Sequence, residues 1–135
     1  MPASDHYHET VKHALVKDGW TIVDEQVKIE IGRRRLWIDL QARKADQNLA
    51  ILVEVKGFEN SPSSVQELTQ ALGQYVVYQV ALASIENTLP LYLAVPQAAF
   101  NGILSEALGQ GVIQRIGINL LVFDPVQEEV VVWLP

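Results

Sequence analysis

Two strand-length segments of this chain are apolar at nearly every position, and this continuity limits the folds that the chain can adopt. The segments are RLWIDL, residues 35–40, and AILVEV, residues 50–55. A strand with one face in water alternates apolar and polar residues, whereas consecutive apolar residues are typical of a strand that is covered on both faces. The sequence therefore favours a sheet with helices on both sides, as in α/β proteins.

Helical spacing of apolar residues recurs in two regions. The first helix is expected from Ser4 or Asp5 to Asp18, and the second over residues 61–87 with a serine cap at Ser61 or Ser63. The apolar stripe of the second helix consists of Val65, Leu68, Leu72, Tyr75, Leu82 and Ile85. Gly73 lies inside this helix, where it costs about 1 kcal/mol relative to alanine, so we expect it to mark a close approach of two backbones.

Six further segments have the pattern of strands. They cover residues 20–31, 35–42, 49–58, 91–95, 118–123 and 128–134, with a third helix that begins near Pro96. The short polar turns between the first three strands predict a meander. The element order αβββαβαββ predicts an α/β domain with a mixed sheet flanked by helices, as a single domain over residues 1–135.

Composition excludes several classes of protein and of site. The chain has no cysteine, which removes thiolate zinc sites, disulfides and cysteine nucleophiles. No apolar stretch approaches the roughly 18 to 20 residues that a membrane span requires, and the first residues lack the pattern of a signal peptide. We therefore expect a cytoplasmic protein that does not enter a membrane. The net charge of −6 argues against DNA binding by the whole surface, although a local basic patch could still serve.

The two apolar segments each carry a carboxylate, Asp39 and Glu54, and Lys56 follows on the second. Glu54 and Lys56 are two residues apart and share a face of their strand, and a hairpin places Asp39 beside them. A buried charge costs several kcal/mol unless it is paired or binds a metal ion. One interpretation is an ion pair between Glu54 and Lys56, with Asp39 capping a turn. The other is a Mg²⁺ site for phosphodiester hydrolysis, in which the lysine acts on water or phosphate.

This arrangement resembles the PD-(D/E)xK nuclease superfamily, whose restriction-endonuclease-like core has an acid on the second strand and an acid, any residue and lysine on the third. Asp39, Glu54 and Lys56 match that signature, and Ile38 stands in place of its proline. The resemblance implies that Asp39 and Glu54 bind Mg²⁺ or Mn²⁺ and that all three residues are catalytic.

Related nucleases also carry a glutamine and a tyrosine four residues apart in the long helix, which correspond here to Gln74 and Tyr78. The resemblance implies that Gln74 is part of the active site and that Tyr78 lies near bound nucleic acid. Alternatively, Gln74 is the polar flank of an amphipathic helix and Tyr78 a core aromatic residue.

The first helix departs from the nuclease pattern. Relatives often place a metal-binding glutamate eleven residues before a glycine-aromatic pair, and counting back from Gly19 leads to His8. Imidazole is a poor Mg²⁺ ligand but binds softer ions or phosphate, so His8 is an additional candidate, or else an ordinary boundary residue.

One basic run occurs at a predicted hairpin tip. It consists of Arg33, Arg34 and Arg35, whose guanidinium groups could bind DNA phosphates, or are simply solvated.

Over nearly its full length the chain resembles the XisH family, the fdxN element excision controlling factors found in cyanobacteria. The resemblance rests on five blocks in this order: DHYHETVKHALVKDGWTI, VEVKGF, LTQALGQYVVY, LYLAV and LLVFD. It implies a role in excising a DNA element during heterocyst differentiation, alongside a site-specific recombinase and a small XisI-like protein. The resemblance does not determine the biochemical activity.

Two functions follow from these resemblances. The first is a metal-dependent DNA endonuclease, with Asp39 and Glu54 as metal ligands, Lys56 at the water or phosphate, and Gln74 as a positioning residue. The second is a catalytically inactive accessory factor that binds an XisI-like protein or the recombinase, which the acidic net charge and His8 favour. Nucleases of this fold often cut two strands symmetrically, and this analogy favours a homodimer.

Overall fold

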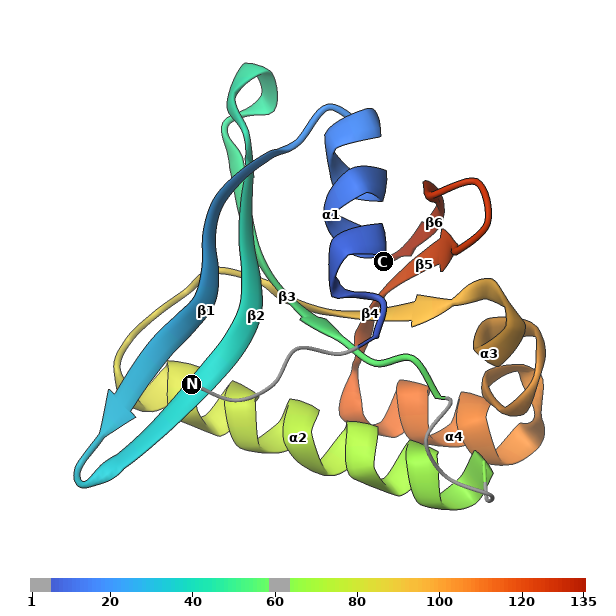
Figure 1. Ribbon diagram of the computed structural model, residues 1–135. Helices are drawn as coiled ribbons and strands as arrows, with labels where there is room; N and C mark the ends of the chain where they lie inside the picture. The colour runs from blue at the N-terminus through green and yellow to red at the C-terminus, as the bar shows by residue number, and fades with distance from the viewer. Residues whose placement is uncertain (1–5, 59–63) are drawn as a thin grey trace.

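A computed structural model describes residues 6–58 and 64–135 of the chain (Figure 1). Its helices and strands, in chain order, are α1 (His8–Lys17), β1 (Thr21–Ile31), β2 (Arg34–Lys44), β3 (Leu49–Val55), α2 (Ser64–Ser84), β4 (Leu91–Pro96), α3 (Gln97–Asn101), α4 (Ala107–Ile116), β5 (Asn119–Asp124) and β6 (Glu129–Leu134). Two short 3-10 turns, η1 (Ala45–Gln47) and η2 (Ile103–Ser105), lie between them. The expected helix start at Ser4 or Asp5 and the expected caps at Ser61 or Ser63 lie outside the described residues.

The six strands form one mixed sheet in the order β1-β2-β3-β4-β5-β6. Strands β1, β2 and β3 pair antiparallel, which confirms the predicted meander. Strand β4 is parallel to both β3 and β5, and β6 is antiparallel to β5. The predicted fold class, a mixed sheet flanked by helices, is therefore confirmed.

The direction of the two parallel crossovers determines which face each helix covers. Both crossovers, β3 to β4 through α2 and β4 to β5 through α4, advance the same way across the sheet. Because such crossovers are right-handed, α2 and α4 must lie on the same face, and α1 covers the other (Figure 1).

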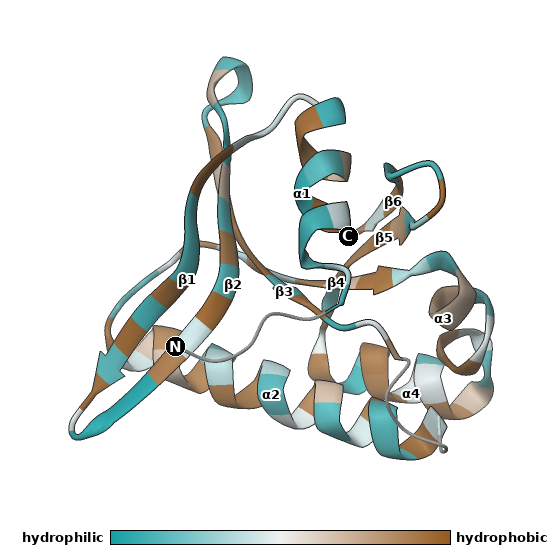
Figure 2. Ribbon diagram, in the orientation of Figure 1, coloured by the Kyte–Doolittle hydropathy of each residue, from teal (hydrophilic) through white to brown (hydrophobic). Residues whose placement is uncertain are grey.

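Each face of the sheet has its own apolar core. On the α2 side, Leu52 and Leu93 pack with Tyr75 of the helix. On the α1 side, Val53 and Phe123 pack with Leu15. Figure 2 shows apolar colouring along the central strands β3 and β4, as expected for strands that are covered on both faces.

The long helix differs from its predicted pattern at three positions. Val65 and Ile85, which belong to the predicted apolar stripe, are exposed, whereas Leu68, Tyr75 and Leu82 are buried as expected. A Cβ atom at Gly73 would meet no atom within 4 Å, so the expected close approach of backbones at this glycine is wrong. The predicted apolar stripe requires the whole helix to contact the core, but the ends of the helix extend beyond the core.

The single helix expected after Pro96 is divided into α3, η2 and α4. Gly102 has φ −96° and ψ −117°, outside the helical region, so α3 ends there. The chain then turns through η2 and begins α4, in which Gly109 is buried against the backbone of η2. Helical periodicity alone cannot reveal such a break, since apolar spacing continues on both sides of it.

Tyr75 ties the long helix to the starts of two strands. Its hydroxyl donates to the Leu91 carbonyl at 2.8 Å and accepts from the Asn119 N–H at 3.1 Å, and its ring is 1% exposed. Burial raises the pKa of the Tyr75 hydroxyl, which remains neutral and able to donate.

We expect Tyr75→Phe to lower the free energy of unfolding by about 1 to 2 kcal/mol, because the part-buried Asn119 N–H loses its partner and the Leu91 carbonyl keeps only the Asn119 side-chain amide, at 3.3 Å, of its two side-chain donors. Urea denaturation of both proteins measures this change. Tyr92→Phe is the matched control, since the Tyr92 hydroxyl donates to the exposed Pro135 carbonyl and its removal should have an effect below about 0.5 kcal/mol. Equal losses in the two variants would contradict the role assigned to Tyr75.

No helix within residues 6–58 and 64–135 combines the length and the apolar character needed to cross a membrane.

Candidate functional site

Asp39 and Glu54 lie where strands β2 and β3 separate. The ladder between these strands ends at the pair Leu40 and Val53, and Asp39 and Glu54 are the next residues of the two strands. Beyond this point β3 continues along β4, and the Lys56 N–H donates to the Ala94 carbonyl at 2.9 Å. Where the two strands separate, backbone N–H and C=O groups lose their partners in the ladder. Side chains must then supply these hydrogen bonds.

The two carboxyl groups supply the missing hydrogen bonds. The Val55 N–H donates to Asp39 Oδ2 at 2.7 Å, and the Asp39 N–H donates to Glu54 Oε1 at 3.2 Å. Both residues are 7% exposed. Asp39 therefore binds the neighbouring strand rather than a turn, and the two carboxyl groups are held against each other from adjacent strands, as the hairpin geometry predicts.

The backbone around Asp39 is distorted. Ile38 belongs to the core on the α2 side and Leu40 to the core on the α1 side, although residues two apart in a regular strand share a face. Gln26, which lies opposite Asp39 in β1, has φ 50°, in the left-handed region. Non-glycine residues adopt this conformation at a cost of order 1 kcal/mol, and such strain is common at functional sites.

The electrostatics of the pair is dominated by burial and mutual repulsion. Burial, followed by the negative charge of Asp39, raises the pKa of Glu54 to about 9. The hydrogen bond from the Asp39 N–H lowers this pKa, a side-chain hydrogen bond to Asp39 raises it, and the charge of Lys56 lowers it by a smaller amount. At neutral pH Glu54 therefore keeps its proton, unless another cation takes the place of that proton.

The donor set fits a hard divalent cation. Two carboxylates meet in a nearly dry site, and both favour Mg²⁺ or Mn²⁺, which bind oxygen ligands. The repulsion that keeps a proton on Glu54 is relieved when a divalent ion lies between the two groups. Asp39 and Glu54 are thus the residues that would hold such an ion.

Comparison with known proteins identifies the family of the chain. The XisH protein family matches residues 1–131. The crystal structure of an XisH family protein from Nostoc punctiforme PCC 73102 is 32% identical, with a TM-score of 0.89 over 97% of this chain and 100% of that one.

This chain belongs to the XisH family.

A second solved structure agrees with this assignment. The fdxN element excision controlling factor protein from Anabaena variabilis is 36% identical to this XisH-family chain, with a TM-score of 0.88 over 96% of this chain and 98% of that one. None of the curated proteins compared with the chain is significantly similar to it.

Tyr78 approaches the carboxyl pair of this XisH-family protein from α2. Burial raises the pKa of its hydroxyl, and the charges of Glu54 and then Asp39 raise it further. Tyr78 also packs against the core on this side, as the interpretation as a core aromatic expects, while its place near bound nucleic acid stays a prediction.

Gln74 lies one turn before Tyr78 in α2, on the same side of the helix. Its side chain is exposed, and within the described ranges no hydrogen bond joins it to Asp39, Glu54 or Lys56. The structure therefore shows no hydrogen bond between Gln74 and these three residues, and the role of Gln74 as a positioning residue stays a prediction.

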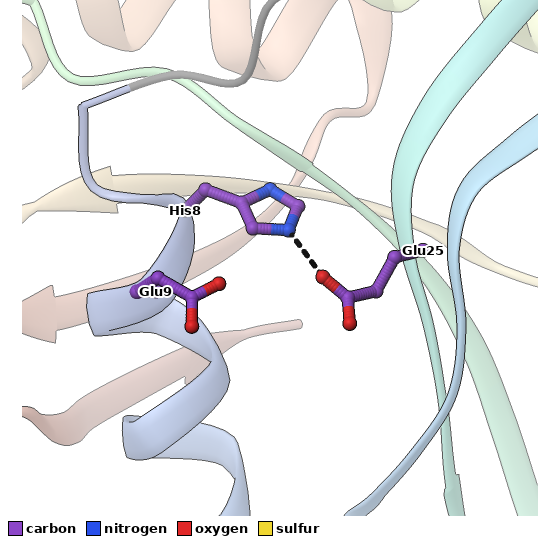
Figure 3. Close-up of side chains that lie close together, drawn as sticks. All are labelled: His8, Glu9 and Glu25. Atoms are coloured by element: carbon purple, nitrogen blue, oxygen red, sulfur yellow. Dashed lines mark hydrogen bonds and ion pairs between the residues drawn. The ribbon is translucent and has the colours of Figure 1, made fainter. Parts of the chain in front are cut away.

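His8 is buried at the start of α1 and faces the carboxyl pair on one side. Its Nε2 lies 2.9 Å from Glu25 Oε1, and its Nδ1 lies 4.0 Å from Asp39 Oδ1. Figure 3 shows the His8 ring directed toward Glu25, with Glu9 beside it on the same helix. One ligand atom from each of His8, Glu9 and Glu25 lies within 4.8 Å of the other two.

Glu25 and Lys12 complete this group and were not singled out by the sequence analysis. Lys12 Nζ lies 3.0 Å from Glu25 Oε2 and 3.3 Å from Glu9 Oε2. The hydrogen bond from His8, followed by that from Lys12, lowers the pKa of Glu25. Lys12 follows His8 by four residues, a spacing that places both on one side of α1 and could have drawn attention to Lys12.

The three arginines are not part of the carboxyl site. Arg33, Arg34 and Arg35 are exposed at the tip of the β1–β2 hairpin, which projects away from the rest of the molecule (Figure 1). Arg35 precedes Asp39 by four strand residues, roughly 13 Å at about 3.3 Å per residue. Their binding of DNA phosphate therefore stays a prediction about a separate surface.

Proposed function

We propose that this XisH-family chain is a DNA element excision controlling factor that hydrolyses phosphodiester bonds in DNA with a divalent metal ion. The observation that carries the proposal is the contact of two buried carboxyl groups, Asp39 and Glu54, at the point where β2 and β3 separate, with Lys56 directly after the end of β3. The factor from Anabaena variabilis supports the link to DNA excision.

Each residue of the site has a definable task in this reaction. Asp39 and Glu54 would hold Mg²⁺ or Mn²⁺, and their hydrogen bonds to the Val55 and Asp39 N–H groups fix their orientation. The ion, when bound, would supply polarisation of the phosphate and activation of water. Lys56, as a flexible point charge, would stabilise the charge that develops on the phosphate or take a proton from the attacking water.

Cleavage assays test the proposal. Supercoiled, linear and branched DNA are incubated with the protein and Mg²⁺ or Mn²⁺, and Lys56→Ala is expected to slow cleavage by about tenfold or more. Lys17→Ala is the control, because Lys17 binds the Gln127 carbonyl at the far end of α1. No metal-dependent cleavage of any substrate, or equal rates for Lys56→Ala and the wild type, would refute catalysis by this site.

A non-catalytic role is favoured by one observation on α2. Val76, Val77 and Val80 are exposed, with Val80 62% exposed, and their spacing places them together on one side of the helix. Exposed apolar clusters often bind proteins. The second candidate is therefore an accessory factor that binds an XisI-like protein or a recombinase. Co-purification with such a partner that Asp39→Asn does not affect, but Val80→Asp abolishes, would support it.

A further inference from the structure

The Nδ1 atom of His8 is buried without a hydrogen-bond partner. The residue is 5% exposed, and no donor or acceptor in the described part of the chain binds this nitrogen. The other ring nitrogen, Nε2, is held by Glu25 Oε1 at 2.9 Å. A buried polar atom without a partner costs about 1 to 3 kcal/mol, so this one calls for a ligand.

The contacts of Glu25 define which nitrogen carries the proton. Glu25 also binds the Lys12 ammonium, at 3.0 Å, and is therefore a carboxylate that can only accept. His8 must then donate from Nε2. In the neutral ring Nδ1 carries a lone pair, and it lies 4.0 Å from Asp39 Oδ1, which is also an acceptor. Two acceptors that face each other in a dry site repel, and either a proton on Nδ1 or a cation between the two atoms relieves that repulsion.

The 4.0 Å separation suits one shared ion. Two atoms that each bind an ion at about 2.1 Å can be at most about 4.2 Å apart. The opposite side of the ring, toward Glu9 and Glu25, already has a cation, because the Lys12 ammonium lies 3.3 Å from one carboxylate and 3.0 Å from the other. The ion therefore belongs on the Nδ1 side, with Asp39.

We propose that His8 binds through Nδ1 the same metal ion as Asp39 and Glu54, that Glu25 positions its ring, and that the imidazole makes the site prefer Mn²⁺ to Mg²⁺. This inference rests on the metal site of the proposed function. A metal-binding histidine commonly donates its other N–H to a carboxylate, which is the arrangement of His8 and Glu25. Nitrogen ligands favour transition-metal ions over Mg²⁺.

Pulsed EPR of Mn²⁺ bound to the full chain tests the inference directly. We expect a ¹⁴N coupling from a coordinated imidazole in the wild type, and its loss in His8→Ala. Titration calorimetry should show Mn²⁺ affinity reduced by about tenfold or more in His8→Ala and in Glu25→Gln, with Mg²⁺ affinity changed much less. His13→Ala and Glu9→Gln are the matched controls on the same helix, and both should retain the coupling and the affinity.

The outcomes separate this inference from the proposed function. If Asp39→Asn abolishes Mn²⁺ binding but the wild type shows no ¹⁴N coupling, the role of His8 is refuted and the carboxylate site stands. If Mn²⁺ binding is lost in Glu9→Gln and retained in Asp39→Asn, the ion lies on the Nε2 side of the His8 ring, toward Glu9 and Glu25. That result would refute the inference. If the wild type binds no Mn²⁺, both proposals fail. The ¹⁴N coupling is measured on the wild type, so this part of the test does not depend on whether any variant folds.

Discussion

Replacing Glu54 by glutamine is expected to stabilise the metal-free protein at pH 8 by roughly 2 kcal/mol and to reduce metal-dependent DNA cleavage by about 100-fold or more. Glutamine keeps the hydrogen-bonding pattern, since its carbonyl can accept from the Asp39 N–H as Glu54 Oε1 does, at 3.2 Å. Its amide can donate to the Asp39 carboxylate. The variant thus removes the repulsion of two carboxylates and the metal ligand together.

The sign of the stability change follows from the direction of the pKa shift. Burial and the charge of Asp39 raise the pKa of Glu54 from 4.5 to about 9 in the folded protein. Between these two pH values the unfolded chain loses the proton while the folded chain keeps it. The wild type should therefore become less stable as pH rises from about 4.5 toward 9, and Glu54→Gln should lack this part of the pH dependence.

Urea denaturation with EDTA at pH 5, 7 and 9 measures this difference. Glu30→Gln serves as the control, because Glu30 is an exposed carboxylate whose pKa is lowered by its hydrogen bond to Lys28, so its replacement should not stabilise the protein. If the Glu54→Gln variant is less stable than the wild type at every pH, the charged Glu54 carboxylate stabilises the fold as a hydrogen-bond acceptor. That result would contradict its description as a metal ligand repelled by Asp39.

Added Mn²⁺ extends the same experiment. An ion that binds only the folded protein stabilises it in proportion to the logarithm of its concentration above Kd. The wild type at pH 8 should therefore gain stability with Mn²⁺, while Glu54→Gln should gain little. A structural carboxyl pair would give equal, negligible responses in both proteins.

The carboxyl pair could be predicted from the sequence because its position depends on local features. Asp39 and Glu54 interrupt two apolar segments that are joined by a short turn, and the register of a hairpin follows from its turn. The side-chain hydrogen bonds by which these residues replace the ladder could not be predicted, because they depend on where β3 leaves β2 for β4.

The group around His8 could not be predicted for a different reason. Glu25 reaches His8 only because α1 packs across β1, a contact between residues 17 positions apart that no periodicity encodes. The sequence singled out His8 by its resemblance to a metal-binding position, but the identity of its partner, and hence which nitrogen is left for a ligand, requires the tertiary structure.

The surroundings of two helical glycines, one in α2 and one in α4, could not be predicted from the sequence. Gly73 was expected to allow a close approach and faces open space, whereas Gly109 makes such an approach. Both are glycines within helices, and the sequence around them does not distinguish the two cases. The difference lies in η2, a turn that follows Gly102 and brings its backbone against α4.

We expect Gly109→Ala to destabilise the protein by about 3 kcal/mol. A Cβ atom at this position would contact the Ile103 carbonyl oxygen and lie 2.7 Å from the Leu104 Cα. Both contacts are with backbone, which cannot move aside as a flexible side chain can. Ile103 and Leu104 are buried in the core on the α2 side, so a shift of η2 would also disturb their packing.

Gly111→Ala is the matched control, since Gly111 lies in the same helix and a Cβ there would meet no atom within 4 Å. Alanine at this exposed position should stabilise the protein by about 0.5 to 1 kcal/mol through its higher helix propensity. Urea denaturation of both variants, with equal m-values, measures the two changes. Opposite signs are expected from two identical substitutions only two residues apart, and a stabilised Gly109→Ala would show that α4 does not pack on η2 as described.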